Sequence, residues 1–408
     1  MTSKIIVRAA VISLILVLLS VSIPIPPVKG LGVSTIQYPL FQKGMCYVTW
    51  SKDNFELPSS DRSLKSMADS GVTCVSIVVT WYQEKYNSTE ITTTDRTPSD
   101  ASVRHAIRKA HEYGMNVMLK PHIDLIAEEG NNRSDIGFNS PEKWRAWFSS
   151  YLRFITHYAL IAREESVEFF CIGTELSFAA SQKIFWKEML IPETRKIFPG
   201  QIVYAANWDE YSEVEFWDDL DYIGIDSYFP LSDKDNPSLD ELRAGWGKWL
   251  AGIEAVQEKY DKPVIFTESG YCSADSAARK PWEEAMGGTA NTALQADCYR
   301  ALLETFWDKP WFYGVYWWNW NTYPGSGGNA NKKFTPQNKP ALDDMKLWYN
   351  QCNLGQKLVF NSRWHQSIND AEIPARMALT GGSIKQTLPD GVSISAELAG
   401  RPGREAKE

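Results

Sequence analysis

Short apolar runs alternate with longer amphipathic segments through most of the chain after residue 43. The short runs are continuously apolar, which is typical of strands that are buried on both faces of a parallel sheet. The longer segments repeat their apolar residues at helical spacing, as in Trp144, Trp147, Tyr151 and Tyr158 after Pro141. Eight runs are predicted to form strands, at about 44–49, 74–81, 116–124, the apolar part of 167–178, 201–208, 221–230, 262–271 and 311–320.

Helical segments lie between these runs, and several carry end signals. Ser99 or Asp100 can cap one helix that Gly114 ends, and Ser140 can cap another that has Pro141 in its first turn. Further helices are predicted at about 61–70, 239–260, 291–307 and 341–349. Eight strands that are each followed by a helix predict an α/β fold, a (β/α)8 TIM barrel with one catalytic domain over residues 31–352.

A doubly wound open sheet is the rival fold, since it has no fixed number of strands. It would usually show a glycine-rich turn after the first strand, and the sequence there, YVTWSKDNFE, contains no glycine. The order of elements therefore favours the barrel.

The two ends of the chain differ from this pattern. Lys4 and Arg8 precede an uncharged apolar run, so residues 1–30 are predicted to be a secretory signal, with an uncleaved membrane anchor as the alternative. Residues 353–408 are rich in glycine, serine and charge and are predicted to be a disordered tail. We expect a secreted, extracellular protein, and the sequons at Asn87 and Asn132 would suit a secreted glycoprotein.

Composition narrows the function only a little. The net charge is -8 with no basic face in the sequence, which does not favour nucleic acid as a partner. Aromatic residues make up 13% of the chain, and they suit either core packing or the stacking of sugar rings. Six cysteines include no C-x-x-C pair, so a structural zinc site is not expected, and Cys46, Cys74 and Cys171 are interpreted as buried thiols within strands.

Polar and aromatic residues gather where the predicted strands end. The carboxyl ends of the strands form the active-site face of a barrel, so these residues are the candidate site. They are Trp50, Trp81, Lys120, His122, Asp124, Glu175, Asn207, Tyr228, Glu268 and Trp318.

Glu175 and Glu268 follow the fourth and seventh strands, which lie nearly opposite each other in a ring of eight. Cleavage of a glycosidic bond needs two carboxyl groups, one to protonate the leaving oxygen and one to attack or stabilise the anomeric carbon. Rim carboxylates in salt bridges are the structural alternative for either residue alone. The pair predicts a hydrolase of sugars, with a carboxyl separation of about 5–5.5 Å if the enzyme retains configuration.

The sequences IGTEL, FTESGY, LKPHID and YWWNW, in this order, resemble glycoside hydrolase family 113, the β-mannanase family of the retaining clan A. The resemblance covers about residues 44–349. It implies that Glu175 is the general acid/base, that Glu268 is the nucleophile, and that the substrate is β-1,4-mannan or a manno-oligosaccharide. Many clan members carry asparagine where this chain has Thr174, although family 113 has the same threonine. Asn207 is then the candidate for binding the substrate 2-hydroxyl.

The remaining candidates are expected to bind or orient the sugar. Lys120, His122 and Asp124 could hydrogen-bond its hydroxyls, and Tyr228 could donate to Glu268. His122 and Asp124 have no third ligand at a suitable spacing, so no metal or other cofactor is expected.

Trp318 is predicted to form the floor of the central subsite, with Trp317 as the alternate because neighbours along a strand point to opposite faces. Trp50, Trp81 and Trp208 could extend this platform. Three other functions stay open: hydrolysis of another β-linked glycan (xylosidic, glucosidic or glycosaminoglycan), sugar binding without catalysis, and transglycosylation.

Overall fold

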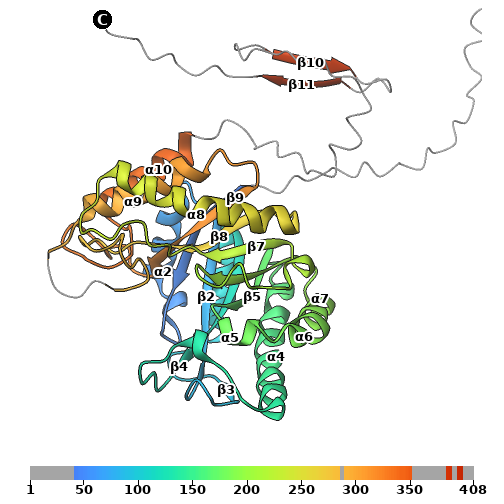
Figure 1. The fold of residues 1–408 in the computed structure, drawn as a ribbon. Helices are drawn as coiled ribbons and strands as arrows, with labels where there is room; N and C mark the ends of the chain where they lie inside the picture. Colours follow the sequence, from blue (N-terminus) through green and yellow to red (C-terminus); the bar gives the residue numbers. More distant parts are fainter. Residues whose placement is uncertain (1–40, 285–288, 352–382, 388–392, 398–408) are drawn as a thin grey trace, which may run out of the picture. The chain divides into compact units, whose positions relative to one another are not determined.

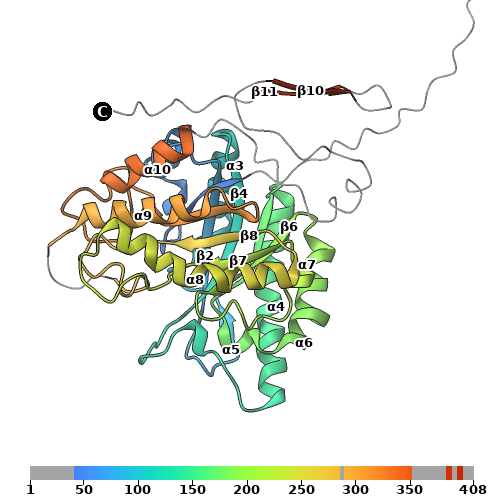
Figure 2. The ribbon, with the colours of Figure 1, turned by 45° about the horizontal axis from the view of Figure 1, so that its top comes forward.

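The computed structural model describes residues 41–284 and 289–351, together with the backbone of residues 383–387 and 393–397. Within the first two ranges, eight parallel strands close into a barrel with helices around it (Figures 1 and 2). In order around the ring the strands are β1 (Gln42–Val48), β2 (Cys74–Gln83), β4 (Asn116–Leu125), β5 (Phe169–Thr174), β6 (Gln201–Asn207), β7 (Tyr222–Asp226), β8 (Val264–Ser269) and β9 (Phe312–Asn321), and β9 pairs with β1. The predicted TIM barrel is confirmed.

One short strand was not predicted. β3 (Ile91–Thr92) pairs antiparallel with the end of β2, where Tyr82 lies opposite Thr92. It extends the sheet beyond the barrel. Because β3 is counted in the numbering, the predicted fourth and seventh strands of the barrel are labelled β5 and β8.

The helices largely follow the predicted ends. The Ser99 side chain accepts from Ser102 N and caps α3, and the Ser140 side chain accepts from Lys143 N and caps α4. The described helices of the barrel are α2 (Pro58–Asp69), α3 (Asp100–Glu112), α4 (Pro141–Glu164), α5 (Ser177–Ala180), α6 (Lys183–Phe185), α7 (Ile191–Ile197), α8 (Leu239–Tyr260), α9 (Thr292–Phe306) and α10 (Pro340–Gln351). Short 3-10 turns occur at Asn54–Glu56, Arg133–Asp135 (η2) and Trp217–Asp219, and one π turn at Trp186–Leu190.

The apolar core has two layers. The larger layer lies between strands and helices and contains the buried Trp147, Trp186 and Trp246. A smaller one includes Cys46, Cys74, Cys171, Val78 and Met118, whose side chains alternate along the strands with those of the larger layer and fill the barrel interior. Cys46, Cys74 and Cys171 are buried thiols without a disulfide, as predicted.

The predicted signal or anchor at residues 1–30 lies outside the described residues. Within residues 353–408, β10 (Ser383–Thr387) and β11 (Ser393–Glu397) pair as an antiparallel hairpin. The rest of the predicted tail is not among the described residues. Across the part of the chain that the structure describes, no helix has the length and apolar character needed to cross a membrane.

Candidate active site

Side-chain alternation along β4 places three polar residues on one face of the strand. Lys120, His122 and Asp124 are spaced two apart and share the face of Met118, which belongs to the interior layer. Lys120 is fully buried and His122 is 3% exposed, whereas Asp124 near the end of the strand is partly exposed. The strand therefore carries a buried cation toward the end of the barrel where the candidate carboxylates lie.

Glu268, on β8, is held by hydrogen-bond donors. Lys120 Nζ lies 2.6 Å from Glu268 Oε1, and the Tyr228 hydroxyl donates to Glu268 Oε2 at 2.8 Å. The carboxylate is 4% exposed. The ammonium of Lys120 and the phenol of Tyr228 therefore hold both oxygens of this buried carboxyl group in place.

Lys120 also contacts a second carboxylate. Asp226 lies opposite Glu268 in the pairing of β7 with β8, and Lys120 Nζ is 3.1 Å from Asp226 Oδ1. Burial opposes the charge on Lys120, yet Asp226 and Glu268 hold its pKa above the ordinary value. One ammonium cannot balance two buried carboxylates, and burial together with the Glu268 charge raises the pKa of Asp226.

Glu175 follows the last residue of β5 and turns out of the strand direction. Its φ of 53° lies in the left-handed region, and its backbone N–H donates to Ala205 O of β6 at 2.8 Å. The side chain is 22% exposed, so solvent or a ligand can reach it. Burial raises the pKa of Glu175 above its ordinary value, the Arg133 guanidinium opposes this, and the Glu268 charge adds to the rise. A raised pKa suits a general acid.

Arg133 and His122 lie between the two glutamates. Arg133 Nη1 is 3.4 Å from Glu175 Oε2 and donates to His122 Nδ1 at 3.2 Å, while Arg133 Nη2 pairs with Asp124. Because Nδ1 accepts a hydrogen bond, the proton of a neutral His122 is on Nε2, which lies 3.5 Å from Glu268 Oε1. Burial, Arg133 and Lys120 lower the pKa of His122 well below its ordinary value, so the ring is neutral.

The profile of Glycoside Hydrolase Family 113 matches residues 45–339, which is most of the chain. The chain belongs to this family. It is therefore a glycoside hydrolase, and its substrate is a carbohydrate. The family and the enzyme class agree with those predicted from the strand-end sequences.

Solved structures agree with this assignment. A GH113 β-1,4-mannanase is 30% identical with a TM-score of 0.69, and the match covers 76% of this chain and 99% of that one. A GH113 β-mannanase, AaManA, from Alicyclobacillus acidocaldarius in complex with ManMIm is 26% identical with the same TM-score, and covers 76% and 97%. An endo-β-1,4-mannanase from Thermotoga petrophila, at 12% identity, TM-score 0.51 and 79% coverage of each chain, shows the shared fold only. No curated protein matches the chain.

In this family 113 chain, the two tryptophans of β9 point to opposite sides. Trp318 stacks at 6.1 Å from His122, with the ring planes 7° apart, and packs beside Tyr228. Trp317 is fully buried and stacks on Tyr299 of α9. The structure thus brings Trp318, and not Trp317, to the carboxylate cluster. The peptide bond after Trp318 is cis.

Trp81 does not join the cluster. Its indole packs against Phe154 of α4, and its Nε1 donates to the Tyr158 hydroxyl at 2.9 Å. It lies two residues after Val79, in the layer between barrel and helices, so strand alternation turns it away from the interior. The prediction that Trp81 binds substrate is corrected to a packing role.

Three other candidates lie at the strand ends with different surroundings. Trp50 follows β1 and is 44% exposed. Asn207 ends β6, where its Oδ1 accepts from Trp208 N at 2.9 Å. Trp208 stacks on the exposed Trp282 at 5.4 Å with planes 13° apart. These contacts leave their predicted sugar-binding roles as predictions.

Sequence reasoning gave no role to two residues of the cluster. Asp226 was noted only as a residue at the end of the sixth predicted strand, and the structure places it in register with Glu268. Arg133 lies in η2, where Asn132 and Asp135 form a capping box that fixes the turn. Neither the position of Arg133 in the sequence nor the residues beside it mark it as a partner of Glu175.

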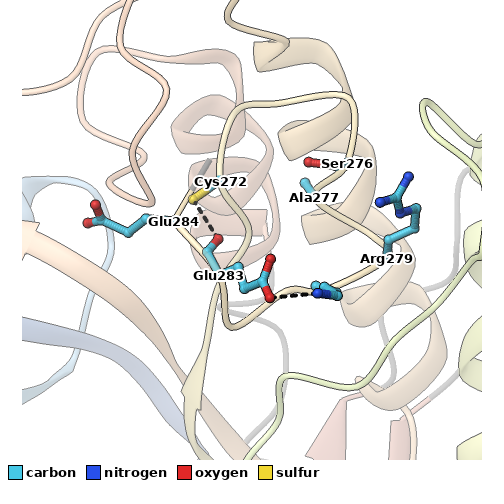
Figure 3. Close-up of a pocket in the computed structure, with 7 residues that line it drawn as sticks. Cys272, Ser276, Ala277, Arg279, Glu283 and Glu284 are labelled. Carbon is cyan, nitrogen blue, oxygen red and sulfur yellow. Dashed lines mark hydrogen bonds and ion pairs between the residues drawn. The ribbon is translucent and has the colours of Figure 1, made fainter. Parts of the chain in front are cut away.

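Two hollows lie among the loops. One of about 610 Å³ is lined by aromatic and amide side chains from the loops after β2, β4 and β5, including Tyr86, Asn139, Phe178 and Gln182. A smaller one of about 200 Å³ lies in the loop after β8, where Glu283 accepts from Cys272 through its carbonyl and pairs with Lys280 through its side chain (Figure 3). None of the candidate site residues lines either hollow, although the first is lined by Phe178 and Gln182 from the segment that follows Glu175.

Proposed function

We propose that this family 113 hydrolase cleaves β-1,4-mannan or manno-oligosaccharides with retention of configuration, with Glu175 as acid/base and Glu268 as nucleophile. One observation carries the proposal: the two glutamates have opposite environments within one cluster. Glu268 accepts from Lys120 and Tyr228, while Glu175 has a raised pKa. A carboxyl group held by two donors beside one with a raised pKa suits the nucleophile and the acid/base of double displacement.

In the first half of the reaction, an ionised Glu268 oxygen attacks the anomeric carbon as the bond to the leaving oxygen breaks. Glu175 gives its proton to that oxygen, so the leaving sugar departs as an alcohol. Lys120 and Tyr228 hold the attacking carboxylate in place without being moved by the substrate, since both are buried.

In the second half, Glu268 is a neutral ester and no longer raises the pKa of Glu175. The Glu175 carboxylate can then take a proton from water, whose oxygen attacks the anomeric carbon and releases Glu268. Lys120 keeps Asp226 as a partner through this step, so esterification of Glu268 does not leave the buried ammonium without a carboxylate.

The mannan specificity is supported by the two family 113 relatives, both of which are described as β-mannanases. Trp318 beside His122 offers a flat apolar face to a sugar ring in the cluster. The hollow with Tyr86 and Phe178 offers further aromatic and amide surface for a longer chain.

A substrate panel tests the proposal. Purified protein is incubated with β-1,4-mannan, xylan, β-glucan and a glycosaminoglycan, and new reducing ends are measured. We expect the fastest release from mannan, and a loss of several orders of magnitude in Glu175→Gln and Glu268→Gln with the fold intact by circular dichroism. Glu213→Gln, an exposed glutamate after β6, is the matched control and should keep full activity. Faster hydrolysis of another glycan would overturn the substrate, and activity in either catalytic variant would overturn the mechanism.

A further inference from the structure

Glu210 is a buried carboxyl beside the proposed acid/base that the mechanism above does not use. It lies in the turn after β6 and is 6% exposed. Its Oε1 accepts from the Tyr204 hydroxyl at 2.6 Å, and its Oε2 accepts from Ser177 Oγ and from Asn207 N, both at 3.1 Å. A buried acidic group with this many donors is an organised feature of the fold, not a surface charge.

These contacts join Glu210 to the segment that carries Glu175. Ser177, two residues after Glu175, bonds Glu210 directly. Leu176 is joined through Tyr204, because Leu176 N donates to the Tyr204 hydroxyl at 2.9 Å while that hydroxyl donates to Glu210. Leu176 and Ser177 are therefore both anchored to the carboxyl group of Glu210, in the turn after β6.

The anchoring matters because Glu175 has a left-handed backbone, at φ 53°. This conformation is unfavourable for a residue with a Cβ, and it persists only where the surroundings hold it. The bond from Glu175 N to Ala205 O fixes one side of the residue, and the contacts of Leu176 and Ser177 fix the other.

We propose that Glu210 is a positioning residue for the acid/base: it holds the turn that aims Glu175. The inference rests on the proposed acid/base role of Glu175. Glu210 is then a third carboxyl group of the site, which acts through Glu175 and does not itself touch the substrate.

Glu210 is mainly protonated below about pH 7. Burial raises the pKa of Glu210 to about 7 against the donation from Tyr204, Asn207 and Ser177, and the Glu175 charge adds to the rise. Below that pH, Glu210 therefore acts on the segment of Glu175 through the hydrogen bonds to Tyr204 and Ser177 and not through a charge. The charged groups that act on Glu175 are Arg133, Glu268, Lys120 and Asp124, and each is left in place when Glu210 alone is changed.

Two kinds of variant separate the anchor from the charge. Glu210→Gln removes the charge but keeps an oxygen that can accept from Tyr204, so kcat should stay close to that of wild type. Tyr204→Phe leaves Leu176 N without its acceptor, so kcat should fall about tenfold or more with the alkaline limb of the kcat/KM profile unmoved. Glu210→Ala removes the acceptor of both Tyr204 and Ser177, and it stands in for Tyr204→Phe if that variant does not fold.

The decisive measurement is the ¹³C NMR signal of the Glu175 carboxyl in protein labelled at glutamate, identified by its absence in Glu175→Gln. We expect this signal to move in Glu210→Ala, which removes the anchor, and to stay close to its wild-type position in Glu210→Gln and in the control Glu213→Ala, at an exposed position three residues on. An unchanged signal in Glu210→Ala, or an equal shift in the control, would overturn the inference. Because this readout needs no substrate, it is separate from the outcome of the glycan panel, whose failure would overturn the proposed function instead.

Discussion

Lys120 and Glu268 are 148 positions apart in the chain, yet the Lys120 ammonium lies 2.6 Å from Glu268 Oε1. Both side chains are almost completely buried. The proposed nucleophile is thus held by a cation on the barrel interior. Asp226, on the neighbouring strand β7, shares that cation.

The first prediction concerns this shared cation. Lys120→Met leaves Glu268 and Asp226 facing each other without a positive charge, which should lower kcat/KM about 100-fold or more and lower the free energy of unfolding by about 3–5 kcal/mol. Steady-state kinetics and urea denaturation measure the two effects. Lys65→Met, at an exposed ion pair with Asp69, is the control and should change neither quantity appreciably. Full activity in Lys120→Met would show that the ammonium does not serve the nucleophile.

The second prediction concerns the phenol that donates to the other oxygen of Glu268. Tyr228→Phe removes this hydrogen bond at 2.8 Å and keeps the ring, so the fold should survive. We expect kcat to fall about 10- to 100-fold, since one preorganised donor to the reacting carboxylate is lost. Initial rates on a manno-oligosaccharide provide the measurement, and a kcat equal to that of wild type would contradict the assigned contact.

The third prediction separates the two tryptophans of β9. Trp318→Ala should raise KM about tenfold while leaving stability nearly unchanged, because its ring faces the cluster and is only partly buried. Trp317→Ala should instead lower the free energy of unfolding by about 3–5 kcal/mol, because the fully buried indole stacks on Tyr299. Steady-state kinetics and thermal melts of the two variants test this prediction. A stability loss in Trp318→Ala together with a raised KM in Trp317→Ala would contradict the assigned orientations.

The fourth prediction is the pH dependence of stability that Glu210 produces. Its folded pKa of about 7 exceeds the ordinary 4.5, so the stability it contributes is complete below about pH 4.5 and is lost as the pH rises to about 7. Wild type should lose up to about 3 kcal/mol over this window relative to Glu210→Gln, which cannot titrate. Urea unfolding of both proteins across the window tests the sign, and parallel pH curves would contradict it.

The barrel itself was predictable because its strands are continuously apolar and their number is eight. The position of Glu175 and Glu268 followed from the same pattern, since each glutamate interrupts an apolar run at the end where a barrel carries its chemistry. The family resemblance then rested on the order of four short sequences around those ends.

Other features of the site depend on contacts that the sequence does not encode locally. Lys120 looked like a sugar ligand, and only the closure of the barrel shows it buried between two carboxylates. Arg133 contacts Glu175 from the turn η2, whose conformation is fixed by a capping box. Glu210 is joined to the segment after Glu175 through Tyr204 of β6. Trp81 is different, because its alternation with Val79 already indicated the outward face.

The most direct test of the central claim is to trap the glycosyl-enzyme. A 2-deoxy-2-fluoro-β-mannosyl fluoride slows the second step more than the first, so the ester with the nucleophile should accumulate. Intact-mass spectrometry should then show one fluorosugar per chain, and peptide mapping should place it on Glu268, with no label in Glu268→Gln. A label on another residue, or hydrolysis of the reagent by an enzyme that never becomes labelled and releases the inverted sugar, would contradict the account.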